Sequence, residues 1–120
     1  MAEQLLLYQK TYDFLLWLYP LINRIPKGHR LVIGRQMEEL GLALLLSIVQ
    51  ANKARGEKRA ELQSTISDQL DALRMLIRLS KDLRFMSVKQ YTLCAEKINE
   101  LGRMLSGWIK VSQTQQDNAI

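Results

Sequence analysis

The segment from Trp17 to Arg30 joins two helical patterns through a turn, and it restricts the fold more than any other stretch of the chain. Pro26 is expected to end the first helix, because a proline moves the residue before it out of the helical region. Gly28 can supply the positive φ that a reversal of the chain often needs. The sequence therefore predicts two helices that fold back on each other at this turn.

Helical periodicity continues through most of the 120-residue chain. The chain has only two prolines and six glycines, and it lacks the alternating β-branched runs that build sheets. Pro20 is expected to bend the first helix without ending it, and Ser87 is expected to cap the fourth. Helices are predicted at about residues 3–24, 29–54, 57–84 and 88–110. The predicted fold class is all-α, an up-and-down antiparallel four-helix bundle over residues 1–110 with a disordered C-terminal tail at residues 111–120.

Apolar residues three and four positions apart predict which face of each helix is buried. In the first helix the predicted buried face comprises Leu5, Leu6, Tyr8, Tyr12, Leu15, Leu16, Tyr19 and Ile22. In the third helix the predicted inward residues are Leu62, Ile66, Leu70, Leu73, Ile77 and Leu83. In the fourth they are Tyr91, Cys94, Ile98, Leu101, Leu105 and Trp108. Cys94 is the only cysteine, so it cannot form an internal disulfide, and we expect it to fill the core as a reduced thiol.

The second helix is apolar on nearly all sides between Leu40 and Val49. A four-helix bundle leaves every helix one outer side, so this helix would expose hydrophobic surface in a monomer. We therefore expect a homo-oligomer. The alternative is a helix that is simply surrounded by the other three.

No candidate for enzyme chemistry stands out. His29 is the only histidine, and it is expected in an exposed turn without a positioned nucleophile. Glu38 and Glu39 lack the histidine that a di-metal bundle site uses, and no glycine motif has the spacing of a phosphate loop. We therefore expect no catalysis, no metal and no cofactor. We also expect a cytoplasmic chain with no transmembrane helix, because it begins with no secretion signal and its longest uncharged run is too short to cross a bilayer.

The formal net charge of +5 is concentrated in the second half of the chain. Residues 72–110 hold eight basic and three acidic residues, whereas residues 1–71 come to only +1. Arg74, Arg78 and Lys81 fall within an arc of about 60° on the third helix, away from its predicted core side. We expect no acidic residue after Asp71 to pair with the last two. This basic ridge could neutralise phosphates; the alternative is an ordinary solvated face.

Several of these features together resemble a known four-helix-bundle family. They are the aromatic first helix that ends beyond Trp17, the Ile25-Pro26-Lys27 turn, Arg30, the Ile33-Gly34 pair and the leucine-rich second helix. The family includes the accessory variability determinant (Avd) of diversity-generating retroelements and a protein encoded in intervening sequences of bacterial 23S ribosomal RNA. The latter branch typically carries Ser-Ile-Pro-x-Asn-Ile-Ala-Glu-Gly in its second helix. Here Ser47-Ile48 is followed by Val-Gln-Ala-Asn-Lys, which favours the Avd branch.

The resemblance implies a homopentameric barrel that binds RNA and DNA and associates with the retroelement's reverse transcriptase. Such systems make error-prone complementary DNA from a template RNA, and this DNA diversifies a target gene by mutagenic retrohoming. Avd itself is not the polymerase. The residues expected to contact nucleic acid are Arg74, Arg78, Lys81 and Arg84, with Lys89 as a lesser candidate. The alternatives are a protein-interaction scaffold with an acidic partner, a protein of the ribosomal intervening-sequence type with another function, and an enzyme with an unrecognised site.

Overall fold

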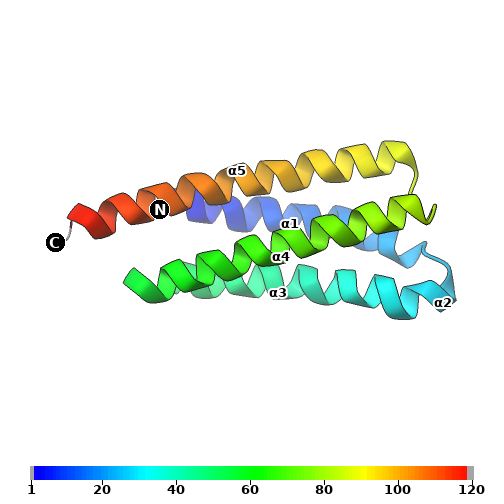
Figure 1. Ribbon diagram of the computed structural model, residues 1–120, viewed down its shortest axis with the longest axis horizontal. Coiled ribbons are helices and arrows are strands. Elements are labelled where there is room, and N and C mark those ends of the chain that lie inside the picture. Colours follow the sequence, from blue (N-terminus) through cyan, green and yellow to red (C-terminus); the bar gives the residue numbers. More distant parts are fainter. Residues whose placement is uncertain (1, 119–120) are drawn as a thin grey trace.

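Four long helices run alternately up and down and pack into a bundle of about 53 × 23 × 20 Å (Figure 1). The structure is a computed structural model that describes the backbone of residues 2–118 and the side chains of residues 5–115. Its elements are α1 (Ala2–Asn23), α2 (Lys27–His29), η1 (Arg30–Gly34), α3 (Arg35–Lys53), α4 (Gly56–Asp82) and α5 (Val88–Asn118). The predicted four-helix bundle is confirmed, with no strand in the described part of the chain.

The long helices contact one another in the order α1, α3, α4, α5 and back to α1. Each helix therefore has two neighbours and one outer side. The contact between α1 and α3 lies opposite the contact between α4 and α5. No helix among residues 2–118 is long and apolar enough to cross a membrane.

The turn after α1 forms where the sequence predicts it, although by a different backbone geometry. Pro26 is extended, with ψ of 139°, and its carbonyl accepts hydrogen bonds from the amides of His29 and Arg30 at 2.9 and 2.8 Å. The positive φ expected at Gly28 is wrong, because Gly28 already belongs to the short helix α2. The extended conformation of Pro26 is sufficient to reverse the chain, and helical geometry resumes directly after it. Pro20 lies inside α1 without ending it, as expected.

The ends of α4 and α5 confirm some expectations and correct others. Ser87 and Gln90 form a capping box, in which the Gln90 amide donates to Ser87 Oγ at 3.0 Å and the Ser87 amide donates to Gln90 Oε1 at 2.9 Å. The end expected at about Lys110 is wrong, because α5 continues to Asn118. Ser112 contacts α4, and no glycine or proline follows Gly107 to stop the helix. The expected tail is thus helical through Asn118, and residues 119–120 lie outside the described residues.

The core is built along one face of each helix, and of the face expected for α1 only Leu15 and Ile22 are buried, while Tyr8 and Tyr19 pack partly buried against the core. The buried residues of α1 are Leu7, Thr11, Phe14, Leu15, Leu18 and Ile22. Leu5, Leu6, Tyr12 and Leu16 of the expected face are instead exposed. On α4 the expected core residues Ile66 to Ile77 are buried, whereas Leu83 is 46% exposed because it follows the last turn of the helix. On α5, Cys94 is fully buried, as expected.

Candidate nucleic-acid interface

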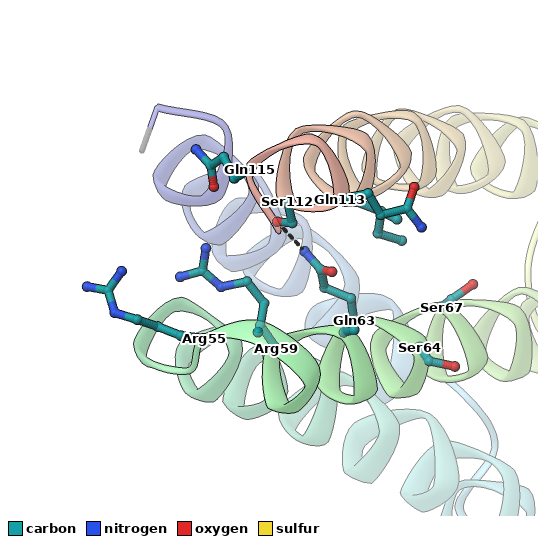
Figure 2. A pocket seen from close by; sticks show the side chains of 11 residues that line it. Arg55, Arg59, Gln63, Ser64, Ser67, Ser112, Gln113 and Gln115 are labelled. Atoms are coloured by element: carbon teal, nitrogen blue, oxygen red, sulfur yellow. Dashed lines mark hydrogen bonds between the residues drawn. The ribbon is translucent and has the colours of Figure 1, made fainter. Parts of the chain in front are cut away.

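A groove runs along the contact between α4 and α5, and two adjoining clefts form it. The first cleft, of about 580 Å³, lies at the N-terminal end of α4 (Figure 2). The second cleft, of about 660 Å³, continues toward the middle of both helices. Ser67 and Ile109 line both clefts, so the two lie side by side. This α4–α5 groove lies on the side of the bundle opposite the α1–α3 contact.

Arg74 is the member of the predicted basic ridge that lines the second cleft. Its guanidinium donates a hydrogen bond to Asp71 Oδ1 at 2.8 Å on α4 and reaches Asn99 Oδ1 of α5 at 3.4 Å. The carboxylate and the amide hold the side chain in the groove, while 41% of it stays exposed. Because the pair with Asp71 is exposed, it contributes little to stability and leaves the guanidinium available for a further anion.

Arg78 and Lys81 lie on the same side of α4, but they are not free of acidic neighbours. Arg78 Nε is 3.9 Å from Asp82 Oδ2, and Lys81 Nζ is 3.3 Å from Asp82 Oδ1. The expectation that no carboxylate follows at helical spacing is therefore wrong, since Asp82 is four positions after Arg78. One carboxylate shared by two cations still leaves the ridge positive. Lys81 also lies 4.8 Å above the ring of Tyr91 on α5, which fixes its position beside the groove.

Arg84 and Lys89 lie outside the groove, near the turn between α4 and α5. Arg84 has φ of 66°, a left-handed conformation that only glycine adopts without cost. It lines a third cleft together with Lys81. Lys89 is exposed in the first turn of α5 and lines none of the three clefts, and Arg78 is likewise outside them. The structure thus places Arg74 in the second cleft, and both Lys81 and Arg84 in the third.

The groove contains basic residues that the sequence analysis did not identify. Arg103 and Lys110 of α5 line the second cleft opposite Arg74. They belong to a polar series on α5 at positions 99, 103, 106 and 110, whose spacing of three and four places it on one helix face. That spacing is the signal in the sequence from which this face could have been predicted.

Charge in the two main clefts is strongly unbalanced. Among their described lining residues, Asp71 is the only carboxylate, whereas five residues are basic: Arg55, Arg59, Arg74, Arg103 and Lys110. A concave surface with cations and little negative charge attracts a polyanion, and the attraction weakens with added salt. The groove is therefore suited to a chain of phosphates.

Arg59 also stabilises the packing of the helices around the first cleft. Its Nε donates to the carbonyl of Ala51 at 3.0 Å, and its Nη2 donates to the carbonyl of Asn52 at 3.1 Å. These carbonyls belong to the last turn of α3, where no amide of the helix is left to pair with them. The guanidinium also lies 5.7 Å from the ring centroid of Trp108. Arg59 thus joins α3, α4 and α5.

Other reactive residues do not assemble into a second site within the part of the chain that the structure describes. His29 is exposed, and its ring packs against Phe85 with 4.7 Å between ring centroids. No group of three or more histidine, cysteine, aspartate or glutamate side chains there could hold a metal ion.

Comparison with known proteins agrees with the predicted resemblance. A search of curated proteins found no match to the chain. The model of one protein family, described as bAvd-like, matches residues 5–112. This match covers all four long helices except the ends of α1 and α5. It includes the lining of the α4–α5 groove up to Ser112, whereas Gln113 and Gln115 lie beyond it. The chain therefore belongs to the bAvd-like family.

Proposed function

We propose that this chain is a nucleic-acid-binding accessory protein of a diversity-generating retroelement. Membership of the bAvd-like family suggests the accessory role, and the unbalanced charge of the α4–α5 groove is the observation that supports nucleic-acid binding. The arginines would contact phosphate oxygens, which carry affinity but no sequence information. The chain would not synthesise DNA itself.

In this proposal the protein binds the template RNA, and DNA as well, and associates with the reverse transcriptase of the element. By neutralising the phosphates of a folded RNA, it would hold the template where the polymerase begins complementary DNA synthesis. The error-prone product would then enter the target gene by retrohoming. Binding through phosphates suits this task, since a variable template must be accepted whatever its sequence.

We also propose a homo-oligomer, supported by two exposed apolar surfaces on different sides of the subunit. On the α1–α3 side, Leu16 and Leu46 are 63% and 61% exposed, and an apolar cleft lies beside Leu16, between the two helices. On the outer side of α4, Met75 and Leu79 are 72% and 42% exposed. Two different surfaces that pack head to tail generate a ring, whereas one surface packing on itself generates a dimer. Five subunits are the number that the family resemblance implies.

Replacing Arg74, Arg78 and Lys81 together by alanine tests nucleic-acid binding. The variant should keep its helicity and its oligomer size, because the pairs of Arg74 and Arg78 with carboxylates are exposed and Lys81 pairs with the exposed Asp82. Its affinity for duplex DNA should fall, and the slope of log affinity against log salt should flatten by up to roughly three, about one for each lost phosphate contact. Fluorescence anisotropy over a salt series measures both quantities.

A matched control removes two arginines and one lysine from other exposed positions: Arg24, Arg35 and Lys58. It has the same net charge as the ridge variant, so any difference between the two variants depends on position. Equal losses in both would show that overall charge, and not the position of the ridge, attracts nucleic acid. Unchanged binding in the ridge variant would refute the assignment and favour a scaffold for an acidic protein partner.

A further inference from the structure

The first cleft of the groove differs in chemistry from the basic ridge. Apart from its two arginines, its polar lining consists of uncharged hydrogen-bonding side chains: Gln63, Ser64, Ser67, Ser112, Gln113 and Gln115. It contains no carboxylate among its described lining residues. Amides and hydroxyls both donate and accept hydrogen bonds, as the edges of nucleobases do, whereas arginine and lysine side chains only donate them.

A hydrogen bond between the two helices divides this cleft. Gln63 Nε2 donates to Ser112 Oγ at 3.1 Å, and Gln63 is itself 2% exposed. Figure 2 shows Arg55, Arg59 and Gln115 on one side of this bridge and Ser67 and Gln113 on the other. The bridge uses one donor of Gln63 and leaves its carbonyl oxygen and the Ser112 hydroxyl hydrogen available. The side of the cleft that holds the two arginines thus lies next to a side lined by uncharged polar residues.

We propose that this cleft binds an unpaired nucleotide, with the phosphate beside Arg55 and the base among the serine and glutamine side chains. Its volume of about 580 Å³ lies within the range of small-molecule sites, roughly 300–1,000 Å³. The next phosphates of the same strand would continue into the second cleft toward Arg103 and Arg74. A duplex would not fit in this way, because its bases are stacked and paired, and proteins read RNA bases mainly where strands are unpaired.

A protein segment is a poorer occupant for the same cleft. Ala60 and Ile109 are the only apolar side chains in its described lining, so a peptide or a second copy of this chain would find few apolar side chains to pack against there. The apolar surfaces of the subunit lie elsewhere, on the α1–α3 side and on the outer side of α4. Polar groups and arginines favour an anionic and hydrogen-bonding ligand instead.

This inference rests on the proposed nucleic-acid binding and adds a preference for unpaired strands. The test uses a cleft variant, Gln113→Leu with Gln115→Leu, in which two exposed amides are lost without a change in charge. The matched control, Gln36→Leu with Gln50→Leu, makes the same change on α3. Affinities are measured by fluorescence anisotropy for short homopolymeric RNA strands and for an RNA duplex of equal length.

The wild-type protein should bind at least one homopolymer more tightly than the duplex. The cleft variant should bind that strand roughly tenfold more weakly, as expected for two lost hydrogen bonds, with an unchanged salt slope and unchanged duplex affinity. The control should behave as the wild type. A cleft variant that keeps the wild-type preference for the single strand overturns the inference, and so does a loss of the same size in the control.

Two further comparisons separate the possible outcomes. Calorimetric titration with nucleoside monophosphates shows whether the cleft takes a free nucleotide or needs a strand. If the wild-type protein binds a monophosphate and the cleft variant does not, a free nucleotide is sufficient. If the wild-type protein binds no monophosphate, the strand is required. Failure of the proposed function itself looks different. In that case the Arg74, Arg78 and Lys81 variant keeps the affinity of the wild type for both strand and duplex. If that variant loses affinity while the cleft variant keeps its strand preference, the function stands and the unpaired-nucleotide site is refuted.

Discussion

Two substitutions of Arg84 distinguish the effect of its left-handed backbone on stability from the effect of its charge on nucleic-acid binding. Arg84 follows the last turn of α4 with φ of 66°. The amide of Phe85 donates to the carbonyl of Ser80 at 2.8 Å, and the amide of Arg84 donates to that of Lys81 at 2.9 Å. This pair of hydrogen bonds is the Schellman motif, whose left-handed position is usually glycine. An arginine there is unfavourable for the backbone but places a cation in the third cleft, beside Lys81.

The expected stability change follows from two opposing terms. A left-handed conformation costs an L-amino acid about 1–2 kcal/mol. Glycine avoids that cost but loses about 0.4–1 kcal/mol more through the greater entropy of the unfolded chain. Since Arg84 is exposed, little packing is lost with its side chain. Arg84→Gly should therefore raise the free energy of unfolding by about 1 kcal/mol, or about 4 °C in melting temperature for a domain of this size.

Arg84→Ala is the matched control, because it removes the same charge and keeps the strained backbone. Melting temperatures at equal protein concentration should rise for the glycine variant and stay near the wild-type value for the alanine variant. Both variants should lose the same nucleic-acid affinity, with a salt slope smaller by about 0.9 on duplex DNA. A glycine variant no more stable than the alanine variant would refute the strain argument. Wild-type affinity in both would remove Arg84 from the contact set.

Three further predictions concern stability and assembly. Ser87→Ala should lower the free energy of unfolding by about 1 kcal/mol, since the Gln90 amide loses its capping oxygen; urea unfolding measures this. Burial raises the pKa of the Cys94 thiol to about 12, and Lys97 opposes the shift. The unfolded thiol ionises first as the pH rises, so stability should fall between about pH 9 and 12 by up to ~1.4 kcal/mol per pH unit relative to Cys94→Ala; an equal pH dependence in both proteins would contradict this. Leu16→Glu should dissociate the oligomer in native mass spectrometry while Leu16→Met keeps it, because only the first puts a charge on the exposed apolar surface.

The number and direction of the helices could be predicted from periodicity and turn residues, but the buried face of α1 could not. Its true core series passes through Thr11, which is fully buried and whose hydroxyl has no partner among the described residues. The threonine interrupts the apolar pattern, so the uninterrupted series through Tyr8 and Tyr12 appeared to be the core. Because α1 is apolar on several sides, spacing alone does not distinguish a core face from a face that is left exposed in the single subunit.

Of the basic site, only the part that lies on a single helix could be predicted from the sequence. Arg74, Arg78 and Lys81 lie on one helix, where their common face follows from an angle of 100° per residue. Arg103 and Lys110 join them only because α4 and α5 are neighbours, which is a property of the packing and not of either helix alone. The pairing of Arg78 with Asp82, by contrast, follows from their spacing of four positions on one helix.

The opposite placement of the two surfaces makes assembly and nucleic-acid binding separable. The apolar α1–α3 side and the α4–α5 groove lie on opposite sides of the bundle, so packing through Leu16 would not cover the groove of the same subunit, while the next subunit would meet Leu16 with the outer side of its α4, at Met75 and Leu79. A ring would then display several grooves, and a long RNA could occupy more than one at once, which raises its apparent affinity without any new contact. Leu16→Glu should accordingly leave the affinity for a short oligonucleotide unchanged and reduce that for a long RNA by roughly a hundredfold or more. An equal loss for both lengths would mean that subunit contacts complete the binding site, and that the groove of one subunit is not sufficient.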